Sequence, residues 1–488
     1  MTITKFTFSH PFDDDKLKEE CGVFGVIGMS DAANFVALGL HALQHRGQEA
    51  GGIVAYDATG GFNSARRFGY VRDNFTSKSL MSTLPGALSI GHVRYSTAGS
   101  KHAAIRDVQP FFGEFSMGGA AIAHNGNITN AEALRRELIE RGSIFQSSSD
   151  TECIIHLMAR SLQQNIPERM EDALRRVEGA FSIVAMTDQK LIGVRDPMGM
   201  RPLVLGRLAD GWVLSSETCA LDIIGAEFIR EVSPGEMVVI SEKGLESHFP
   251  FRKRASKFCI FEHVYFSRPD SIVSGRSVYE TRRQIGVELA KESPVEADLV
   301  CPVPDSGTPA AIGFSQHSGI PYAMGIIRNQ YMGRTFIEPT DQIRNMGVRL
   351  KLNVNRSLIE GKRVILVDDS VVRGTTSRKI KDMVLDAGAK EVHFRIASPP
   401  TAWPCFYGVD TPEREKLLAA TMSEEEMRQH LSVNSLKFIS LDGLYRAVGE
   451  AEGRNKECPQ YCDACFSGQY PIAPSDMLNK GFRLEAAQ

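Results

Sequence analysis

The stretch 364–377 reads Val364-Ile365-Leu366-Val367-Asp368-Asp369-Ser370-Val371-Val372-Arg373-Gly374-Thr375-Thr376-Ser377. Its apolar run is typical of a buried strand and ends in two carboxylates. A glycine and hydroxyl residues follow, and a helical pattern begins at about Ser377. Backbone N–H groups and the positive end of a helix would converge on an anion there. An isolated Asp-Asp pair more often only turns the chain, but the whole stretch predicts a phosphate-binding turn whose carboxylates could hold sugar hydroxyls or Mg²⁺.

A second strand of the same half of the chain also ends in an acidic turn. Asp298-Leu299-Val300-Cys301-Pro302-Val303-Pro304 leads into Asp305-Ser306-Gly307. The repeated order of strand, loop and helix predicts a doubly wound parallel sheet, and such sheets bind ligands at the carboxyl ends of their strands.

A glycine-containing segment with several cations lies between the two turns. It reads Arg328-Asn329-Gln330-Tyr331-Met332-Gly333-Arg334-Thr335-Phe336-Ile337 and is followed by Arg344, Arg349 and Lys351. Alone, it would more often be a solvated surface stretch. Between two phosphate-binding turns, it is a candidate lid that closes over a pyrophosphate and excludes water.

The N-terminal half predicts a layered mixture of sheet and helix. Short apolar runs, such as 21–28 and 180–186, indicate buried strands, and helical patterns cover 130–141 and 150–164. The basic stretch 251–257 indicates a domain junction. We therefore expect four segments: 1–20, a domain over 21–250, a domain over 251–449 and a cysteine-containing segment over 450–488.

The bulk composition describes an ordinary globular chain. With 488 residues it exceeds what one core usually organises, and its net charge of -3 gives no basic excess that would suggest nucleic acid. No apolar run is long enough for a membrane span, and the first twenty residues lack the pattern of a secretory signal. We expect a cytoplasmic protein, in which nine cysteines favour thiol chemistry or metal ligation over a disulfide framework.

The stretch 364–377 closely resembles the phosphoribosyl pyrophosphate signature of the type I phosphoribosyltransferases. The resemblance implies that Asp368 and Asp369 face the ribose and Mg²⁺, and that Ser306 is a further Mg²⁺ ligand near the pyrophosphate. The implied substrate-binding residues are Asp368, Asp369, Ser370, Arg373, Gly374, Thr375, Thr376, Ser377 and Arg334.

Four segments of the N-terminal half occur in an order that resembles the N-terminal-nucleophile glutamine amidotransferases, which have a four-layer αββα fold. The segments are Cys21-Gly22-Val23-Phe24-Gly25, His45-Arg46-Gly47-Gln48-Glu49-Ala50-Gly51-Gly52, Gly91-His92-Val93-Arg94-Tyr95-Ser96-Thr97 and His124-Asn125-Gly126-Asn127-Ile128. In that family the nucleophile is the first residue, and its own α-amine, with a reference pKa of about 7.7–8.0, activates the thiol. The resemblance therefore implies cleavage between Glu20 and Cys21, which makes residues 1–20 a propeptide.

The same resemblance assigns roles to the residues that would hold glutamine. Arg94 would clamp the α-carboxylate with two parallel hydrogen bonds, and Asp150 would take the α-ammonium. Asn125 and the Gly126 N–H would form the oxyanion hole.

The spacing of Cys458, Cys462 and Cys465 fits zinc, an iron–sulfur centre or a redox pair, and spacing alone does not choose between them. From Cys21 onward, however, the chain resembles the glutamine phosphoribosylpyrophosphate amidotransferases, some of which carry a structural [4Fe–4S] cluster. The resemblance implies the ligands Cys259, Cys405, Cys462 and Cys465, with Cys458 as a competitor. Cys153, Cys219 and Cys301 are expected in the core.

The activity implied is the formation of 5-phosphoribosylamine, glutamate and pyrophosphate from glutamine, phosphoribosyl pyrophosphate and water, the first committed step of purine synthesis. Ammonia would pass between the sites internally, but no residue in the sequence marks that passage. Purine nucleotides as inhibitors and a homo-oligomer, a dimer or tetramer, are implied as well. The alternatives are a glutamine-dependent sugar-phosphate aminotransferase, which would lack the Asp368-Asp369 loop, and a regulator that binds phosphoribosyl pyrophosphate without turnover.

Overall fold

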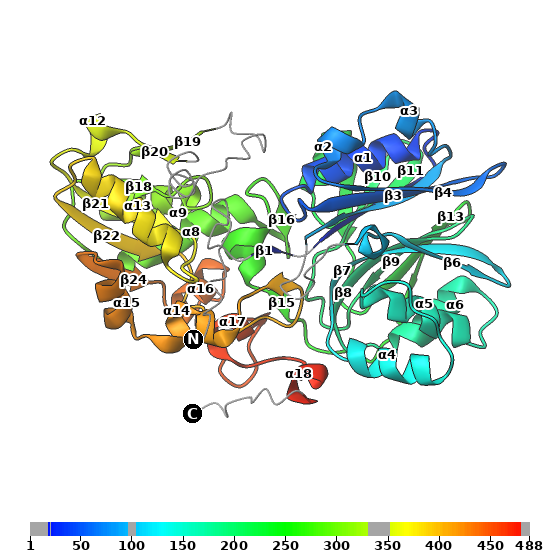
Figure 1. Cartoon of the computed structure of the whole chain (residues 1–488). Helices are drawn as coiled ribbons and strands as arrows, with labels where there is room; N and C mark the ends of the chain where they lie inside the picture. Colours follow the sequence, from blue (N-terminus) through cyan, green and yellow to red (C-terminus); the bar gives the residue numbers. More distant parts are fainter. Residues whose placement is uncertain (1–17, 20, 96–103, 330–351, 480–488) are drawn as a thin grey trace, which may run out of the picture. The chain divides into compact units, whose positions relative to one another are not determined.

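The computed structural model describes residues 18–19, 21–95, 104–329 and 352–479 (Figure 1). The chain forms two compact units. The larger unit holds Lys18–Val278, Pro404–Thr411 and the segment from Lys456 onward, and the smaller unit holds Tyr279–Trp403 and Pro412–Asn455. The candidate lid residues 330–351, with Arg334, Arg344, Arg349 and Lys351, lie outside the described residues, as do most of residues 1–20.

Two stacked antiparallel sheets form the centre of the larger unit. The first has the order β12-β10-β11-β2-β5-β3-β4, and the second has the order β14-β13-β9-β8-β7-β6. The strands of the first sheet are β2 (Gly22–Ile27), β3 (Ala50–Asp57), β4 (Gly61–Phe68), β5 (Leu88–Arg94), β10 (Val204–Leu208), β11 (Gly211–Ser215) and β12 (Glu227–Glu231). Those of the second are β6 (Phe111–Phe115), β7 (Gly118–Ile128), β8 (Gly179–Met186), β9 (Leu191–Arg195), β13 (Met237–Ser241) and β14 (Gly244–His248).

Both faces of each sheet are buried, because successive side chains along a strand point alternately to the two faces. Val23 of β2 belongs to the core between the sheets, with Ile90 and Val184, whereas Phe24 belongs to a second core on the outer face. Because successive side chains of a strand point to opposite faces, both faces of β2 must be covered. This requirement explains why the strand is apolar along its whole length.

Helices cover both outer faces, so the larger unit is a four-layer αββα sandwich, as the sequence predicted. On the first sheet lie α1 (Ala32–Ala42) and α7 (Cys219–Ile224), and on the second lie α4 (Ala131–Glu140), α5 (Thr151–Arg160) and α6 (Ile166–Leu174). The predicted helix over 150–164 is shorter in the structure, because Ser161 takes an extended conformation (ψ 142°) that ends α5. Short helices α2 (Val71–Asn74) and α3 (Lys78–Met81) follow β4.

The smaller unit has the predicted parallel sheet, with the order β18-β21-β22-β24. Its strands are β18 (Leu299–Pro302), β21 (Arg363–Asp368), β22 (Glu391–Ile396) and β24 (Ser435–Phe438). Helices α8 (Val278–Glu292), α9 (Thr308–Ser318), α12 (Arg356–Ile359), α13 (Thr375–Asp386), α14 (Leu418–Thr421), α15 (Glu424–Leu431) and α16 (Leu441–Ala447) accompany it, with the two-stranded ribbon of β19 (Ile326–Arg328) and β20 (Leu352–Val354). Pro302 pairs with Val367, so the two acidic turns leave the same edge of the sheet.

The division between the units differs from the expected boundaries at 250 and 450. The larger unit continues through the basic stretch, where the Lys257 N–H donates to the Met198 carbonyl (2.8 Å). Strand β15 (Phe258–Cys259) then pairs with β25 (Tyr461–Cys462), which returns the C-terminal segment to this unit. The pairing is long-range, and for that reason composition along the chain gave no sign of it.

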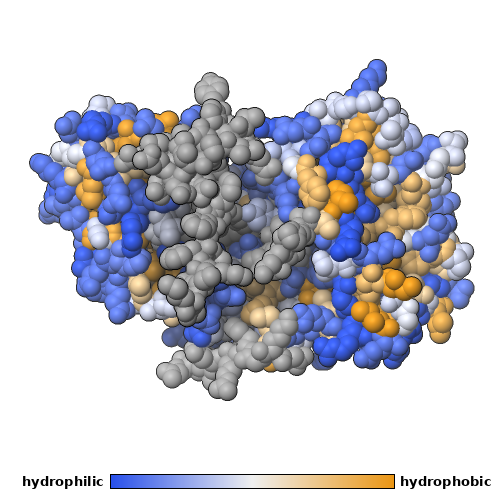
Figure 2. All heavy atoms as spheres, in the orientation of Figure 1, coloured by the Kyte–Doolittle hydropathy of each residue, from blue (hydrophilic) through white to orange (hydrophobic). Residues whose placement is uncertain are grey.

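Hydrophilic residues predominate on the face shown in Figure 2, with smaller hydrophobic patches between them. Within the described ranges, the helices are too short or too polar to cross a lipid bilayer.

Glycine at position 25 sets the spacing between the stacked sheets. A Cβ atom there would lie 2.7 Å from Val184 Cγ1 and 2.8 Å from Leu191 Cδ1, whereas one at Gly51 would meet no atom closer than 3.4 Å. We expect Gly25→Ala to lower the free energy of unfolding by about 1–3 kcal/mol through overpacking, and Gly51→Ala to change it far less. Equal effects of the two substitutions in urea denaturation would contradict this account of the sheet spacing.

Candidate active sites and cysteine cluster

Cys21 lies at the start of β2, where the register of the sheet brings it to the end of β5. Gly22 pairs with Val93, so Cys21 and Arg94 are neighbours across the two strands. Cys21 is buried, has a φ of 84°, and donates its backbone N–H to the Arg46 carbonyl (3.2 Å). Strand β1 (Lys18–Glu19), which precedes it, pairs with β23 (Val409–Asp410). The Cys21 nitrogen is therefore a peptide nitrogen held in a hydrogen bond.

Two of the predicted glutamine-site residues have buried polar atoms without partners. Arg94 Nη1 and both side-chain amide atoms of Asn125 form no hydrogen bond within the described part of the chain. Leaving such groups buried and unpaired costs about 1–3 kcal/mol each, so native proteins rarely do so without a use for them. Of these atoms, Arg94 Nη1 and Asn125 Nδ2 can donate hydrogen bonds to the carboxylate and the oxyanion of a bound ligand.

Gly126 and Asp150 lie beside Asn125 on or against β7. Gly126 has a φ of 144°, and a Cβ atom there would lie 2.0 Å from the Ala180 carbonyl oxygen, so no other residue fits. Asp150 precedes α5 and accepts a hydrogen bond from the Ile128 N–H (2.9 Å) on the same strand. Its side chain is 22% exposed and can still reach a ligand. Cys21 and Arg94 thus adjoin across β2 and β5, whereas Asn125, Gly126 and Asp150 lie on or against the last residues of β7.

Two buried histidines connect the strands that carry these residues. His92, two positions before Arg94, donates from Nε2 to the carbonyl of His124 (3.2 Å), which precedes Asn125. Burial, with the charges of Arg94 and His124, lowers the pKa of His92 from 6.5 to about 3. The neutral ring is therefore the form that ties β5 to β7.

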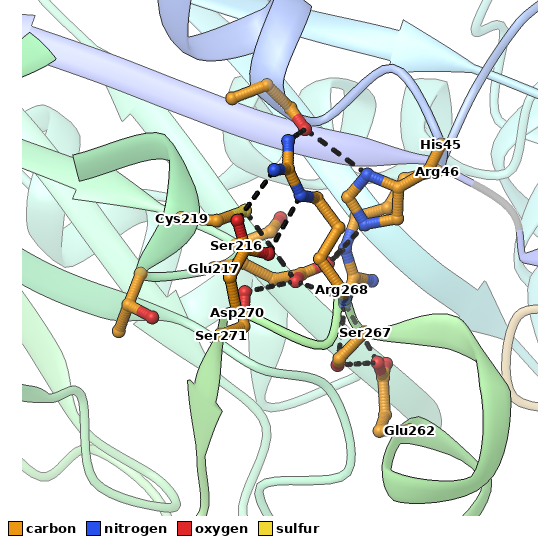
Figure 3. A network of polar contacts seen from close by, with 12 residues as sticks. His45, Arg46, Ser216, Glu217, Cys219, Glu262, Ser267, Arg268, Asp270 and Ser271 are labelled. Atoms are coloured by element: carbon orange, nitrogen blue, oxygen red, sulfur yellow. Dashed lines mark hydrogen bonds and ion pairs between the residues drawn. The ribbon is translucent and has the colours of Figure 1, made fainter. Parts of the chain in front are cut away.

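The sequence did not predict the buried ionic network around Arg46, whose carbonyl accepts the Cys21 N–H (Figure 3). Arg46 forms ion pairs with Glu217 and Glu262, and the side chains of all three are fully buried. His45 also contacts Glu217 (2.6 Å), and Arg201 contacts Glu262 (3.1 Å). Arg46 belongs to the motif 45–52 that the sequence analysis identified. The two carboxylates that pair with Arg46, however, come from distant segments in which no local pattern predicts them.

In the smaller unit, the predicted phosphate turn has the expected geometry. Strand β21 ends at Asp368, and α13 begins at Thr375 directly after Gly374, whose φ is 76°. Asp368, Asp369, Ser370 and Ser377 are buried. The turn therefore presents the start of a helix and a row of backbone N–H groups beside two carboxylates, which suits a phosphate ester of a sugar.

The second acidic turn contacts the first. Ser306 donates to Asp369 Oδ1 (2.5 Å), and Arg328 forms an ion pair with Asp305 (2.6 Å). Among the described residues there is no group of three His, Cys, Asp or Glu side chains that could hold a metal ion. Asp368, Asp369 and Ser306 supply two carboxylates and a hydroxyl, a partial oxygen set that Mg²⁺ completes with waters and substrate oxygens in other phosphate sites.

The four cysteines of the implied cluster, Cys259, Cys405, Cys462 and Cys465, lie in the larger unit and interact with one another. Cys259 pairs with Cys462 across β15 and β25, and the charges of Cys259, Cys405 and Cys462 all act on Cys465. Burial raises the pKa of Cys259 to about 12, and those of Cys462 and Cys465 well above their usual range. Such thiols do not ionise readily unless a cation compensates them.

Among the described residues, these cysteines do not form a preassembled ligand group for a metal ion. Cys405 Sγ also accepts the Tyr407 N–H (3.3 Å). Cys458 is exposed, whereas Cys153, Cys219 and Cys301 are buried as expected.

Comparisons with known proteins agree with this pair of sites. A family model described as a glutamine amidotransferase domain matches residues 92–222. The chain is 55% identical to an amidophosphoribosyltransferase of Rhizobium etli over 96% of this chain and 94% of that protein, and 46% identical to the Bacillus subtilis enzyme of the same name over 93% and 94%. The solved glutamine phosphoribosylpyrophosphate amidotransferase of B. subtilis, complexed with ADP and GMP, matches with a TM-score of 0.87 and 44% identity over 93% of this chain and 98% of that one.

The fold and the sites define a glutamine-dependent phosphoribosyltransferase, in which an amidotransferase sandwich and a parallel-sheet domain share one chain. With this identity over nearly the whole of both chains, the protein belongs to the amidophosphoribosyltransferase family.

The lowered pKa of His92 predicts a pH dependence of stability. His92 stays neutral in the folded protein down to about pH 3, whereas in the unfolded chain it takes a proton near its usual pKa of 6.5. The contribution of neutral His92 to stability is therefore complete above pH 6.5 and is lost progressively as the pH falls below 6.5. His92→Gln keeps a donor for the His124 carbonyl but does not titrate. Between pH 7 and pH 5 the variant should lose about 2 kcal/mol less than the parent chain in urea denaturation. Parallel losses would show that His92 is not the buried neutral group.

Proposed function

We propose that the chain hydrolyses glutamine at Cys21 and transfers the ammonia to phosphoribosyl pyrophosphate. The products are 5-phosphoribosylamine, glutamate and pyrophosphate, and the reaction is the first committed step of purine synthesis. The observation that carries the proposal is the pairing of the nucleophile with unpaired donors: Cys21 adjoins Arg94 across β2 and β5, and both Arg94 and Asn125 hold buried hydrogen-bonding atoms in reserve.

In the glutamine reaction, the Cys21 thiol loses its proton to the α-amine of the same residue and attacks the side-chain amide carbon. Asn125 and the Gly126 N–H take the oxyanion of the tetrahedral intermediate, while Arg94 and Asp150 hold the α-carboxylate and α-ammonium of the substrate. The α-ammonium of Cys21 then protonates the leaving ammonia. Water hydrolyses the resulting thioester to glutamate and regenerates the thiol.

This mechanism requires removal of residues 1–20. A peptide nitrogen has no basic lone pair, and the Cys21 nitrogen donates its only hydrogen to Arg46. Cleavage after Glu20 converts that nitrogen into an amine, which can act as a base near neutral pH.

The phosphoribosyl reaction is proposed for the two turns of the smaller unit. The end of the turn, Arg373 and Gly374, and the first residues of α13, Thr375, Thr376 and Ser377, would hold the 5-phosphate. Asp368, Asp369 and Ser370 would hold the ribose. Ammonia attacks C1 of the ribose as the pyrophosphate leaves, and Mg²⁺, held by Asp368, Asp369 and Ser306, would neutralise charge on that leaving group.

We further propose that Cys259, Cys405, Cys462 and Cys465 hold a structural [4Fe–4S] cluster. Iron would compensate the thiolates, of which those of Cys259, Cys462 and Cys465 are otherwise costly to form because burial raises their pKa, and it would fix the C-terminal segment to the larger unit. We also infer that purine nucleotides inhibit the enzyme, since the B. subtilis relative was solved with ADP and GMP. A cytoplasmic location and a homo-oligomer remain expectations from the family resemblance.

The two half-reactions can be assayed separately, by supplying either glutamine or free ammonia as the source of nitrogen. Cys21→Ala should abolish glutamine-dependent phosphoribosylamine formation while leaving the reaction with free ammonia within about twofold, because the amidotransferase site is bypassed. Asp368→Asn combined with Asp369→Asn should abolish both. Glutamine-dependent activity that persists in Cys21→Ala would disprove the role of this cysteine.

The cluster ligands can be tested against their neighbour Cys458. Cys462→Ser should lower the iron and sulfide content of anaerobically purified protein severely, since four thiolates are needed for a full ligand set. Cys458→Ser, a matched change at an exposed position of the same segment, should leave that content unchanged. Loss of iron in Cys458→Ser with retention in Cys462→Ser would reverse the assignment.

A further inference from the structure

The turn 44–49 contacts both the nucleophile and the residue proposed to clamp glutamine, because the Glu49 N–H also donates to the Arg94 carbonyl (3.1 Å). The Arg46 carbonyl accepts the Cys21 N–H (3.2 Å), and a Cβ atom on Gly22 would meet the Arg46 side chain at 3.3 Å. A Cβ atom on Gly47 would lie 2.6 Å from the Arg94 backbone nitrogen. Any shift of Arg46 would therefore move the partner of the Cys21 nitrogen.

Two carboxylates, those of Glu217 and Glu262, hold the guanidinium of Arg46 (Figure 3). Its Nε donates to Glu217 Oε1, and its Nη2 donates to Glu262 Oε2 (2.8 Å). Arginine presents its donors in a rigid planar fork, so two anchored carboxylates determine both its position and its orientation.

The carboxylates are themselves held in place. Glu217 Oε2 accepts the Arg268 N–H (2.9 Å) and the Ser271 hydroxyl (2.6 Å), and Glu262 Oε2 accepts the Ser267 hydroxyl (2.6 Å). Although burial opposes ionisation, the charges of Arg46 and His45 hold the pKa of Glu217 well below its usual range. This lowered pKa favours the ionised form of Glu217 beside the Arg46 guanidinium.

We infer that Glu217 and Glu262 are positioning residues for the α-amine of Cys21, acting through Arg46. The inference rests on the proposed function, in which that amine is the catalytic base. In the processed chain, the Arg46 carbonyl would orient the amine toward the thiol. The two anions would also balance the guanidinium, whose charge would otherwise lower the pKa of the amine.

The charged and titratable groups around this amine come from several elements. They are His45, Arg46 and Glu49 of the turn, His92 and Arg94 of β5, Arg201, Glu217 and Glu262.

The pH profile of glutamine hydrolysis distinguishes positioning from general structural support. Glu217→Gln removes one negative charge, so the amine should lose its proton more readily. The acidic limb of kcat/KM, which requires the neutral amine, should then move to lower pH by about half to one unit. We expect kcat to fall about tenfold or more from misorientation, while ammonia-dependent activity stays within about twofold.

Glu236→Gln is the matched control. Glu236 is also buried and pairs with an arginine, Arg230 (2.7 Å), but it lies on the loop before β13, and its other side-chain hydrogen bonds are with Ser233 and Ser247. Glu236→Gln should leave the acidic limb of the kcat/KM profile at the same pH as in the parent enzyme. Intact mass should show both variants starting at Cys21.

An unshifted acidic limb in a processed Glu217→Gln enzyme would overturn the inference. If that variant does not fold, Ser271→Ala removes only one hydrogen bond to Glu217 and should lower kcat for glutamine without changing ammonia-dependent activity; an unchanged kcat would overturn the inference as well. Failure of the proposed function is distinguishable, because Cys21→Ala would then retain glutamine hydrolysis.

Discussion

A buried guanidinium must be compensated, and Arg46 meets this constraint with Glu217 and Glu262, both also withdrawn from water. Removing one partner of a buried pair leaves an uncompensated charge, which typically costs about 3–5 kcal/mol. The three side chains join the turn after α1, the loop after β11 and the π-helical turn η2 (Glu262–Phe266). The position of Cys21 depends on these three joined segments, because its backbone N–H donates a hydrogen bond to the Arg46 carbonyl.

The same contacts continue toward the cysteines. Arg201 contacts the second oxygen of Glu262 and donates from Nε to the Tyr407 carbonyl (2.9 Å). The Tyr407 N–H in turn donates to Cys405 Sγ (3.3 Å). Segment 404–411 also adjoins the proposed oxyanion hole, because Asn127 donates to the Phe406 carbonyl (2.9 Å). An iron–sulfur cluster at Cys405 would therefore support the glutamine site mechanically, without taking part in its chemistry.

The sequence predicted the features that local patterns encode. The strand over 364–367, the turn at Asp368 and the helix after Gly374 are contiguous, so their geometry follows from residue order. The αββα sandwich and the family relationship were predicted correctly as well, because several motifs in a fixed order carry them. The end of α5 was missed by a few residues, since an extended Ser161 has no strong breaker beside it.

Contacts between segments far apart in the chain could not be predicted from the sequence. Glu217 and Glu262 lie 171 and 216 residues from Arg46 and belong to no recognised motif. The pairing of β15 with β25 likewise decides the boundary between the units, but it joins segments about two hundred residues apart that are only two residues long each. Such contacts depend on the folded sheets that bring the segments together.

The central claim is that Cys21 acts as an N-terminal residue. It is tested most directly by intact mass and N-terminal sequencing of the purified enzyme, measured together with glutamine-dependent phosphoribosylamine formation. The account predicts that active enzyme begins at Cys21 and that chains still carrying residues 1–20 form phosphoribosylamine only from free ammonia. Full glutamine-dependent activity in chains that retain Met1 would contradict it.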